Sequence, residues 1–196
     1  MQLKRILIAP TRGNKDLETY MDWTRENGFE PIVLSEDMEI DAPLLLCGGG
    51  DIGKNEARDL RELKWIGMAI KAEQPIIGVC RGMQILNQYF GGTVKTLDDL
   101  IVEDHLADDF NDDENHHERL SQFHWVVDQY GNPEMVNSRH HQYCSTVADN
   151  FTVTHRAFTD QLIPEAIEDV ARKIWAVQWH PERSEGMNNT YPLDKL

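Results

Sequence analysis

The sequence predicts an α/β protein with a mainly parallel central sheet and extra antiparallel strands in its C-terminal half. In the N-terminal half, continuously apolar segments alternate with stretches of helical periodicity. Apolar strands separated by helices are typical of a parallel sheet covered on both faces. In the C-terminal half, strand-like segments follow one another with few helices between them, which favours antiparallel additions. The sequence has no internal repeat or linker, so one domain over residues 1–196 is the economical interpretation.

The expected elements are assigned from hydrophobic periodicity and from the residues that end each segment. Strands are expected at Arg5–Pro10, Pro31–Leu34, Pro43–Cys47, Pro75–Val79, Phe123–Gln129, Met135–Asn137, Phe151–Phe158, Glu165–Asp169 and Ile174–Trp179. Helices are expected at Asp16–Glu26, Asn55–Glu73 and Arg81–Phe90.

The net charge of −15 argues against nucleic acid or an anionic membrane as a partner. Much of the excess negative charge lies between Asp98 and Glu118. We interpret this segment as a solvated surface excursion, with a cation site or a docking surface as the alternatives.

No apolar run approaches the ~20 residues of a membrane span, and the N-terminal residues lack a signal peptide's pattern. We therefore expect a cytoplasmic protein.

Cys80 is the cysteine whose sequence context indicates reactivity. An odd number of cysteines without close pairs is not a disulfide framework, and no C-x-x-C motif suggests zinc. Cys80 follows an apolar strand, precedes a helix and is flanked by Gly78 and Gly82, the pattern of a nucleophile elbow. A helix N-terminus favours thiolate over thiol. Cys47 and Cys144 lack this context and are interpreted as structural.

His180 is the candidate catalytic base. It follows an apolar strand and precedes Pro181, which biases it toward an extended conformation. Residues i and i+2 of an extended chain share a face, so Glu182 can hold one ring nitrogen while the other faces Cys80. The alternative for Cys80 is a small core cysteine after a strand, and the alternative for His180 is a hydrogen-bonded histidine at a strand end.

Four segments together resemble the class I glutamine amidotransferase superfamily, in its γ-glutamyl hydrolase branch, which includes γ-glutamyl-γ-aminobutyrate hydrolase. They are residues 46–52 (LCGGGDI), 78–84 (GVCRGMQ), 136–142 (VNSRHHQ) and 179–182 (WHPE). The resemblance runs from about Ile6 to Glu182. It implies a flavodoxin-like, three-layer α/β/α fold and a Cys80–His180–Glu182 triad that cleaves a γ-glutamyl amide through a thioester, without metal or cofactor.

The resemblance also implies the residues around the triad. The oxyanion hole would consist of backbone amides of Gly49, Gly50 and Arg81. Gln84 would contact the glutamyl group, with an ordinary helix position as the alternative. His140 and His141 would lie near its amino and carboxylate ends, with a structural or metal-binding role as the alternative.

Three functions from different classes stay open. A stand-alone γ-glutamyl amide hydrolase is favoured by Arg81 and Met83. The alternative is a glutaminase subunit that passes ammonia to a synthetase partner; a homodimer is compatible with either. A metal-binding or scaffold protein would use His105, His116 and His117 among the acidic residues of Asp98–Glu118, although such loop clusters usually lack fixed geometry. An α/β-hydrolase is disfavoured because its acid precedes its histidine.

The sequence also departs from the hydrolase branch. The chain is shorter than typical members, and the segment after Glu182 is brief. These departures bear on which leaving group is accepted.

Overall fold

A computed structural model of the protein describes residues 3–11, 14–97, 122–159, 163–183 and 190–196. The acidic segment Asp98–Glu118, with its candidate metal-binding residues His105, His116 and His117, lies outside these described residues.

A nine-stranded sheet forms the centre of the protein, in the order β2-β1-β3-β4-β11-β10-β9-β6-β7. Its strands are β1 (Lys4–Ile8), β2 (Phe29–Val33), β3 (Leu44–Leu46), β4 (Ile76–Val79), β6 (Gln122–Asp128), β7 (Pro133–Ser138), β9 (Thr152–Ala157), β10 (Pro164–Asp169) and β11 (Ile174–Val177). Strands β2, β1, β3, β4 and β11 pair in parallel. The remaining pairs are antiparallel, so the predicted change of pairing in the C-terminal half is confirmed.

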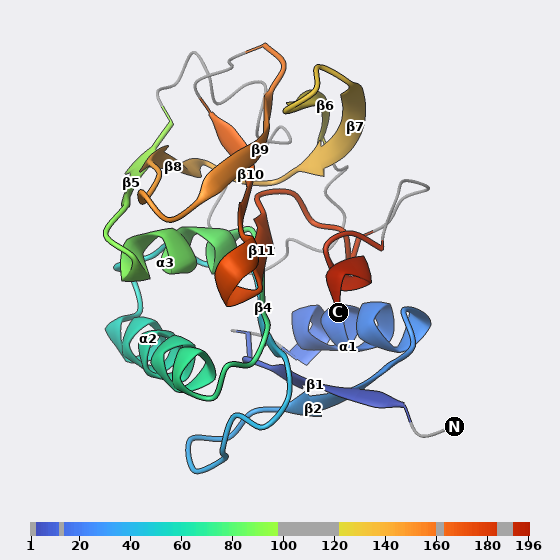
Figure 1. Ribbon diagram of the computed structural model, residues 1–196, viewed down its shortest axis with the longest axis vertical. Helices are drawn as coiled ribbons and strands as arrows, with labels where there is room; N and C mark the ends of the chain where they lie inside the picture. Colours follow the sequence, from blue (N-terminus) through green and yellow to red (C-terminus); the bar gives the residue numbers. More distant parts are fainter. Residues whose placement is uncertain (1–2, 12–13, 98–121, 160–162, 184–189) are drawn as a thin grey trace.

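Helices cover both faces of the parallel part of the sheet (Figure 1). They are α1 (Asn14–Glu26), α2 (Glu56–Lys71) and α3 (Arg81–Tyr89), with short 3-10 turns at Val170–Arg172 and Leu193–Lys195. None of the helices within the described residues is long and apolar enough to cross a membrane. Strands buried on both faces explain why their sequences are continuously apolar rather than alternating.

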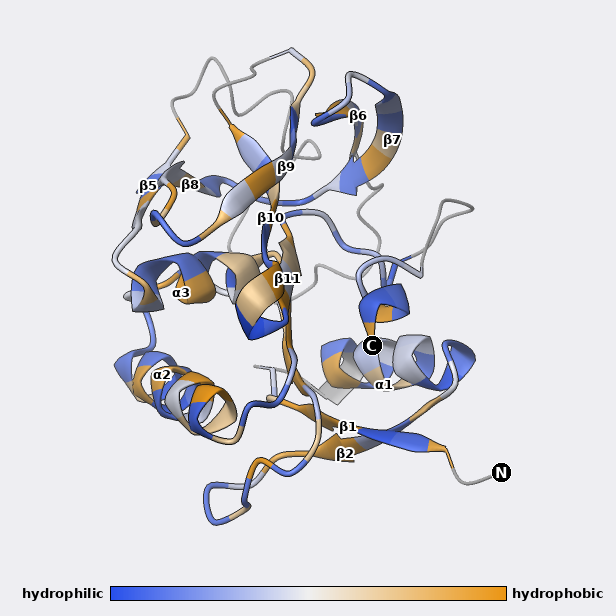
Figure 2. Cartoon of the chain, viewed as in Figure 1, coloured by the Kyte–Doolittle hydropathy of each residue, from blue (hydrophilic) through white to orange (hydrophobic). Residues whose placement is uncertain are grey.

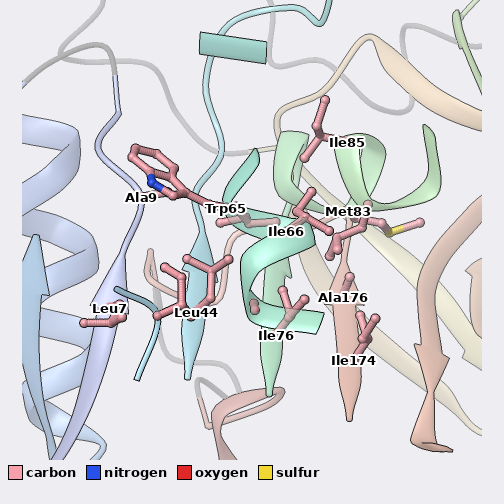
Figure 3. Packing of buried hydrophobic residues seen from close by; sticks show 14 of the residues in the cluster. Leu7, Ala9, Leu44, Trp65, Ile66, Ile76, Met83, Ile85, Ile174 and Ala176 are labelled. Atoms are coloured by element: carbon pink, nitrogen blue, oxygen red, sulfur yellow. The ribbon is translucent and has the colours of Figure 1, made fainter. Parts of the chain in front are cut away.

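The two larger core clusters of the described residues lie on opposite faces of the sheet, and a third, small cluster contains Leu97, Ala157 and Ile163. Trp65 and Ile66 of α2 and Met83 of α3 pack against strand residues such as Leu44 and Ile76 (Figure 3). On the other face, Tyr20 and Trp23 of α1 pack against the alternate residues of the strands. These strand residues are Ile6, Ile8, Leu45, Ile77 and Val177. Figure 2 shows these apolar strands between helices whose outer faces are polar.

Two strands are not predicted by the sequence. Strands β5 (Thr93–Thr96) and β8 (Gln142–Thr146) pair antiparallel in a separate small sheet beside α3. Their sequences, TVKT and QYCST, are polar and short, so hydrophobic alternation does not mark them. The strand expected at Ile174–Trp179 also ends earlier, at Val177.

The turn from β4 into α3 requires glycine at two positions because chain segments approach closely there. A Cβ on Gly78 would lie 2.8 Å from the carbonyl carbon of Gly82, and a Cβ on Gly82 would overlap the carbonyl oxygen of Leu46 in β3. The close packing of β3, β4 and the start of α3 therefore depends on the absence of side chains at both positions.

We expect Gly82→Ala to lower the free energy of unfolding by about 3 kcal/mol, because its methyl group must displace backbone in a packed core. Urea unfolding measures the loss. Gly67→Ala is the matched control: its Cβ would lie 3.3 Å from the movable Tyr89 hydroxyl, and alanine in a helix gains about 0.5–1 kcal/mol over glycine. Equal urea midpoints for the two variants would contradict the packing argument.

Candidate active site

Cys80 stands at the sharp turn between β4 and α3 with φ of +52° and ψ of −106°. This backbone conformation is strained for a residue other than glycine and costs about 1–3 kcal/mol. The turn is held by a 2.7 Å hydrogen bond from the Cys80 N–H to the Val177 carbonyl, and the Met83 N–H donates to the Cys80 carbonyl at 3.0 Å. The turn thus presents the thiol at the carboxyl edge of the sheet.

His180 and Glu182 form a buried pair next to Cys80. The Nδ1 atom of His180 lies 2.6 Å from the Oε1 atom of Glu182. The imidazole and the thiol both border Gly48, where a Cβ would lie 2.8 Å from His180 Cε1 and 3.3 Å from Cys80 Cβ. The three residues singled out by the sequence therefore lie together.

The charges of this cluster support one another. Burial alone would lower the pKa of His180, but the negative charges of Glu182 and the Cys80 thiolate outweigh it and raise the pKa to about 10. Burial would raise the pKa of Glu182, but the His180 charge outweighs it, and the net direction is downward. At neutral pH the site consequently contains an imidazolium ion and an ionised carboxylate.

Two residues that the sequence analysis did not single out hold this pair. The Asn137 side chain accepts from the His180 N–H at 2.8 Å and donates to the His180 carbonyl at 2.8 Å. The Tyr20 hydroxyl accepts from the Gly48 N–H at 2.9 Å, and its contact with Glu182 contributes to the lowered pKa of that carboxyl. Asn137 lies in one of the four motif segments, whereas Tyr20 is indistinguishable from a packing residue of its helix.

Gln178 is a third residue that sequence reasoning missed. Its Nε2 atom donates to the Cys80 sulfur at 3.5 Å, and its Oε1 atom accepts from Gln84 Nε2 at 3.2 Å. Its position two residues before His180 was the available signal, because alternate residues of an extended segment share a face.

A cavity of about 230 Å³ opens beside Cys80 and His180. It is lined by Gly49, Gly50, Asp51, Cys80, Arg81, Gln84, Arg139, His140, His141, Gln142, His180 and Arg183. Every residue predicted to bind substrate or to form the oxyanion hole therefore borders this cavity, and of the predicted triad only Glu182 stands behind it.

The predicted substrate-binding side chains are also bound to protein groups. Gln84 donates from Nε2 to the Gln142 carbonyl at 2.8 Å, so a contact with substrate would use its oxygen. His140 directs Nδ1 to the same carbonyl at 3.0 Å. His141 pairs with Asp51 at 2.8 Å, at the partly exposed rim.

Behind the cavity, Glu165 lies between two histidines. Its carboxylate oxygens are 3.6 Å from His124 Nε2 and 3.5 Å from His140 Nε2. Burial would raise the pKa of Glu165, but His140 and His124 outweigh burial and hold it well below its usual range. Within the described ranges, no group of three or more His, Cys, Asp or Glu residues is arranged to hold a metal ion.

Cys47 and Cys144 are fully buried. Desolvation raises the pKa of both thiols, which keeps them protonated at neutral pH. This matches the structural role that the sequence predicts for them and leaves Cys80 as the cysteine at the cavity.

An α/β sheet with a thiol at a strand-to-helix turn, beside an imidazole–carboxylate pair, defines a candidate cysteine-dependent hydrolase. The family model described as Peptidase C26 matches residues 49–182, a range that includes Gly49, Cys80, His180 and Glu182. The chain belongs to the Peptidase C26 family, which is glutamine amidotransferase-like and hydrolytic.

Three comparisons illustrate its relatives. The glutamine amidotransferase-like protein YvdE of Lactococcus lactis is 31% identical over 195 residues, covering 84% of this chain and 79% of that protein. The γ-glutamyl-CDP-amidate hydrolase of Campylobacter jejuni is 22% identical over 173 residues, covering 82% and 75%. A glutamine amidotransferase of known structure from Thermotoga maritima superimposes with a TM-score of 0.67 at 17% identity, covering 93% and 77%, which establishes a shared fold alone.

We expect Glu182→Gln to lower the pKa of His180 below its wild-type value of about 10, because burial would then act against the imidazolium with less opposing charge. In the wild type, the stabilisation from the raised pKa is complete below about pH 6.5 and is lost as pH rises through about 10. In the variant this loss begins at the same pH, near the unfolded-state pKa, but should be complete at a lower pH. NMR titration of the His180 ring measures the shift. Glu36→Gln, at an exposed carboxylate, is the control, and an unchanged His180 titration in Glu182→Gln would contradict the coupling.

Proposed function

We propose that the protein is a cysteine-dependent hydrolase that cleaves a γ-glutamyl amide and releases glutamate and an amine or amidate. The observation that carries the proposal is the clustering of Cys80, His180 and Glu182 at one cavity, beside the Gly49–Gly50 turn. A thiol with a charged imidazole next to it has both the nucleophile and the proton donor that amide cleavage requires.

In the proposed mechanism the Cys80 thiolate forms a bond to the γ-carbonyl carbon, and the carbonyl electron pair moves onto oxygen. When the intermediate collapses, the C–N bond breaks and the departing nitrogen takes a proton from His180. His180, now neutral, takes a proton from water while the water oxygen attacks the γ-glutamyl thioester. The C–S bond then breaks, which regenerates the thiolate and releases glutamate. Glu182 keeps the imidazole oriented in both steps.

The developing oxyanion would be stabilised by the backbone amides of Gly49, Gly50 and Arg81, each of which borders the cavity. Donors of this kind contribute roughly 3–4 kcal/mol each to transition-state stabilisation. No step in this scheme needs a metal ion or an organic cofactor.

The cavity lining supports an amino-acid-sized, anionic substrate group. Its volume of about 230 Å³ is below the ~300–1,000 Å³ of pockets for larger ligands. Arg139 and Arg183 border it, and their guanidinium charges complement a substrate carboxylate. Similarity to a γ-glutamyl-CDP-amidate hydrolase makes a nucleotide-linked amidate one leaving group to test, next to ammonia and simple amines.

The alternative is the glutaminase subunit of an amidotransferase, whose ammonia a synthetase partner would receive. Arg81 and Met83 favour the hydrolase through their resemblance to that branch. The two functions differ in whether the purified chain is active alone: a hydrolase turns over without a partner, whereas a subunit shows glutaminase activity only when its synthetase is added.

We expect the purified chain to release glutamate from at least one compound in a panel of γ-glutamyl amides that includes glutamine, alkylamides and nucleotide-linked amidates. Cys80→Ala should lower kcat by at least about 10⁴-fold, since removing a nucleophile disables the triad as a unit. Cys144→Ala, at the buried cysteine of β8, should retain activity. Coupled glutamate detection measures both variants. Full activity in Cys80→Ala would disprove the mechanism.

A further inference from the structure

We propose that Arg58 is the positioning residue that directs the oxyanion-hole amides of Gly49 and Gly50 toward Cys80. This inference rests on the proposed amidase function and adds a residue that neither the motif pattern nor the triad geometry identifies. Arg58 lies in the first turn of α2, outside the cavity lining, and its side chain is 6% exposed.

Arg58 holds three successive carbonyl groups of the turn that follows β3. Its Nη2 atom donates to the carbonyls of Cys47 at 3.2 Å and Gly48 at 3.0 Å. Its Nη1 atom donates to the carbonyl of Gly49 at 2.6 Å. The planar guanidinium therefore fixes the orientation of three consecutive peptide planes.

Those orientations determine where the amides point. In a trans peptide the C=O of one residue and the N–H of the next point in opposite directions. With the three carbonyls on the Arg58 side, the N–H groups of Gly48, Gly49 and Gly50 point to the other side. The first of them donates to the Tyr20 hydroxyl, which lies against Glu182, so the other side is the catalytic side.

The next two amides belong to residues that border the cavity with Cys80. Within the described part of the chain, neither the Gly49 nor the Gly50 amide donates to a protein acceptor. Both glycines have positive φ, +90° and +63°, a conformation that side chains rarely adopt. The turn thus presents two directed donors that a substrate oxyanion can occupy.

A buried ion cluster links Arg58 to the other oxyanion donor. Glu62 accepts from Arg58 Nε at 2.7 Å and, through its second oxygen, from the Arg81 guanidinium. Arg81 also pairs with Asp59, which accepts from the Gly53 N–H at 2.8 Å. The backbone N–H of Arg81 is the third predicted oxyanion donor, so Glu62 joins both sides of the hole.

The cluster contains two guanidinium groups and two carboxylates, so its net charge is zero. Arg58 therefore acts on the oxyanion through the directions of peptide dipoles rather than through its own charge. Lysine carries the same charge but presents one rotatable ammonium instead of a rigid fork. It cannot hold three carbonyls and Glu62 together, which makes Arg58→Lys the informative substitution.

The test measures four quantities on the full-length protein: kcat and KM on the preferred γ-glutamyl amide, the rate of Cys80 alkylation by iodoacetamide, and Tm. Alkylation consumes the thiolate without forming an oxyanion. We expect Arg58→Lys to lower kcat by roughly 10²–10³-fold and to leave KM and the alkylation rate within about threefold. Arg61→Lys, at a partly exposed arginine of the same helix paired with Glu36, should leave all four nearly unchanged.

A kcat in Arg58→Lys equal to that in Arg61→Lys would overturn the role of Arg58 alone. A parallel fall of kcat and alkylation rate would also overturn it, because the residue would then act on the thiol or on folding. If Arg58→Lys does not fold, Arg58→Gln, which keeps one amide donor, is measured instead. The proposal then requires that kcat falls more than the alkylation rate. A wild-type protein without amidase activity would overturn both proposals.

Discussion

The constraint on which this structure depends is the contact between the Gly82 backbone and the Leu46 carbonyl, at the turn from β4 into α3. The contact leaves no space for a side chain, so the helix begins directly against the neighbouring strand. Cys80 is forced to positive φ at the apex, and its side chain is left at the carboxyl edge of the sheet. The contact of Gly82 with Leu46 therefore serves both packing and the proposed chemistry, because it also sets the direction of the proposed nucleophile, Cys80.

The parallel order β3-β4-β11 then assembles the site. Parallel neighbours end at the same sheet edge, so the segments that follow the three strands meet there. The glycine turn at 48–50 follows β3, Cys80 follows β4, and Gln178 and His180 follow β11. The antiparallel half adds Asn137 from β7, which holds the His180 backbone from the other side.

The sequence predicts those parts of the protein whose signal is local. Apolar runs mark the parallel strands, and the G-x-C-x-G pattern marks the turn at Cys80. The His180–Glu182 pair follows from the two-residue period of an extended chain. The missed features depend on distant partners: β5 and β8 are polar strands that pair with each other and accept hydrogen bonds from the Asn87 side chain of α3. Arg58 and Glu62 have the i,i+4 spacing of an ordinary surface ion pair, and only tertiary structure buries them beneath the glycine turn at 48–50.

Two of the buried ion clusters at the site have different physical roles. In the Cys80–His180–Glu182 cluster, burial disfavours the proton on His180, whereas the charges of Glu182 and Cys80 favour it. In the proposed reaction His180 gives up this proton and then regains one. The cluster of Arg58, Glu62, Arg81 and Asp59 has balanced charges, and arginine does not lose its proton in proteins. Removing one member of such a pair leaves an uncompensated charge, which is strongly destabilising. We infer that the second cluster keeps a fixed arrangement, and a fixed support is what amide dipoles need if they are to stabilise a charge without reorienting as it develops.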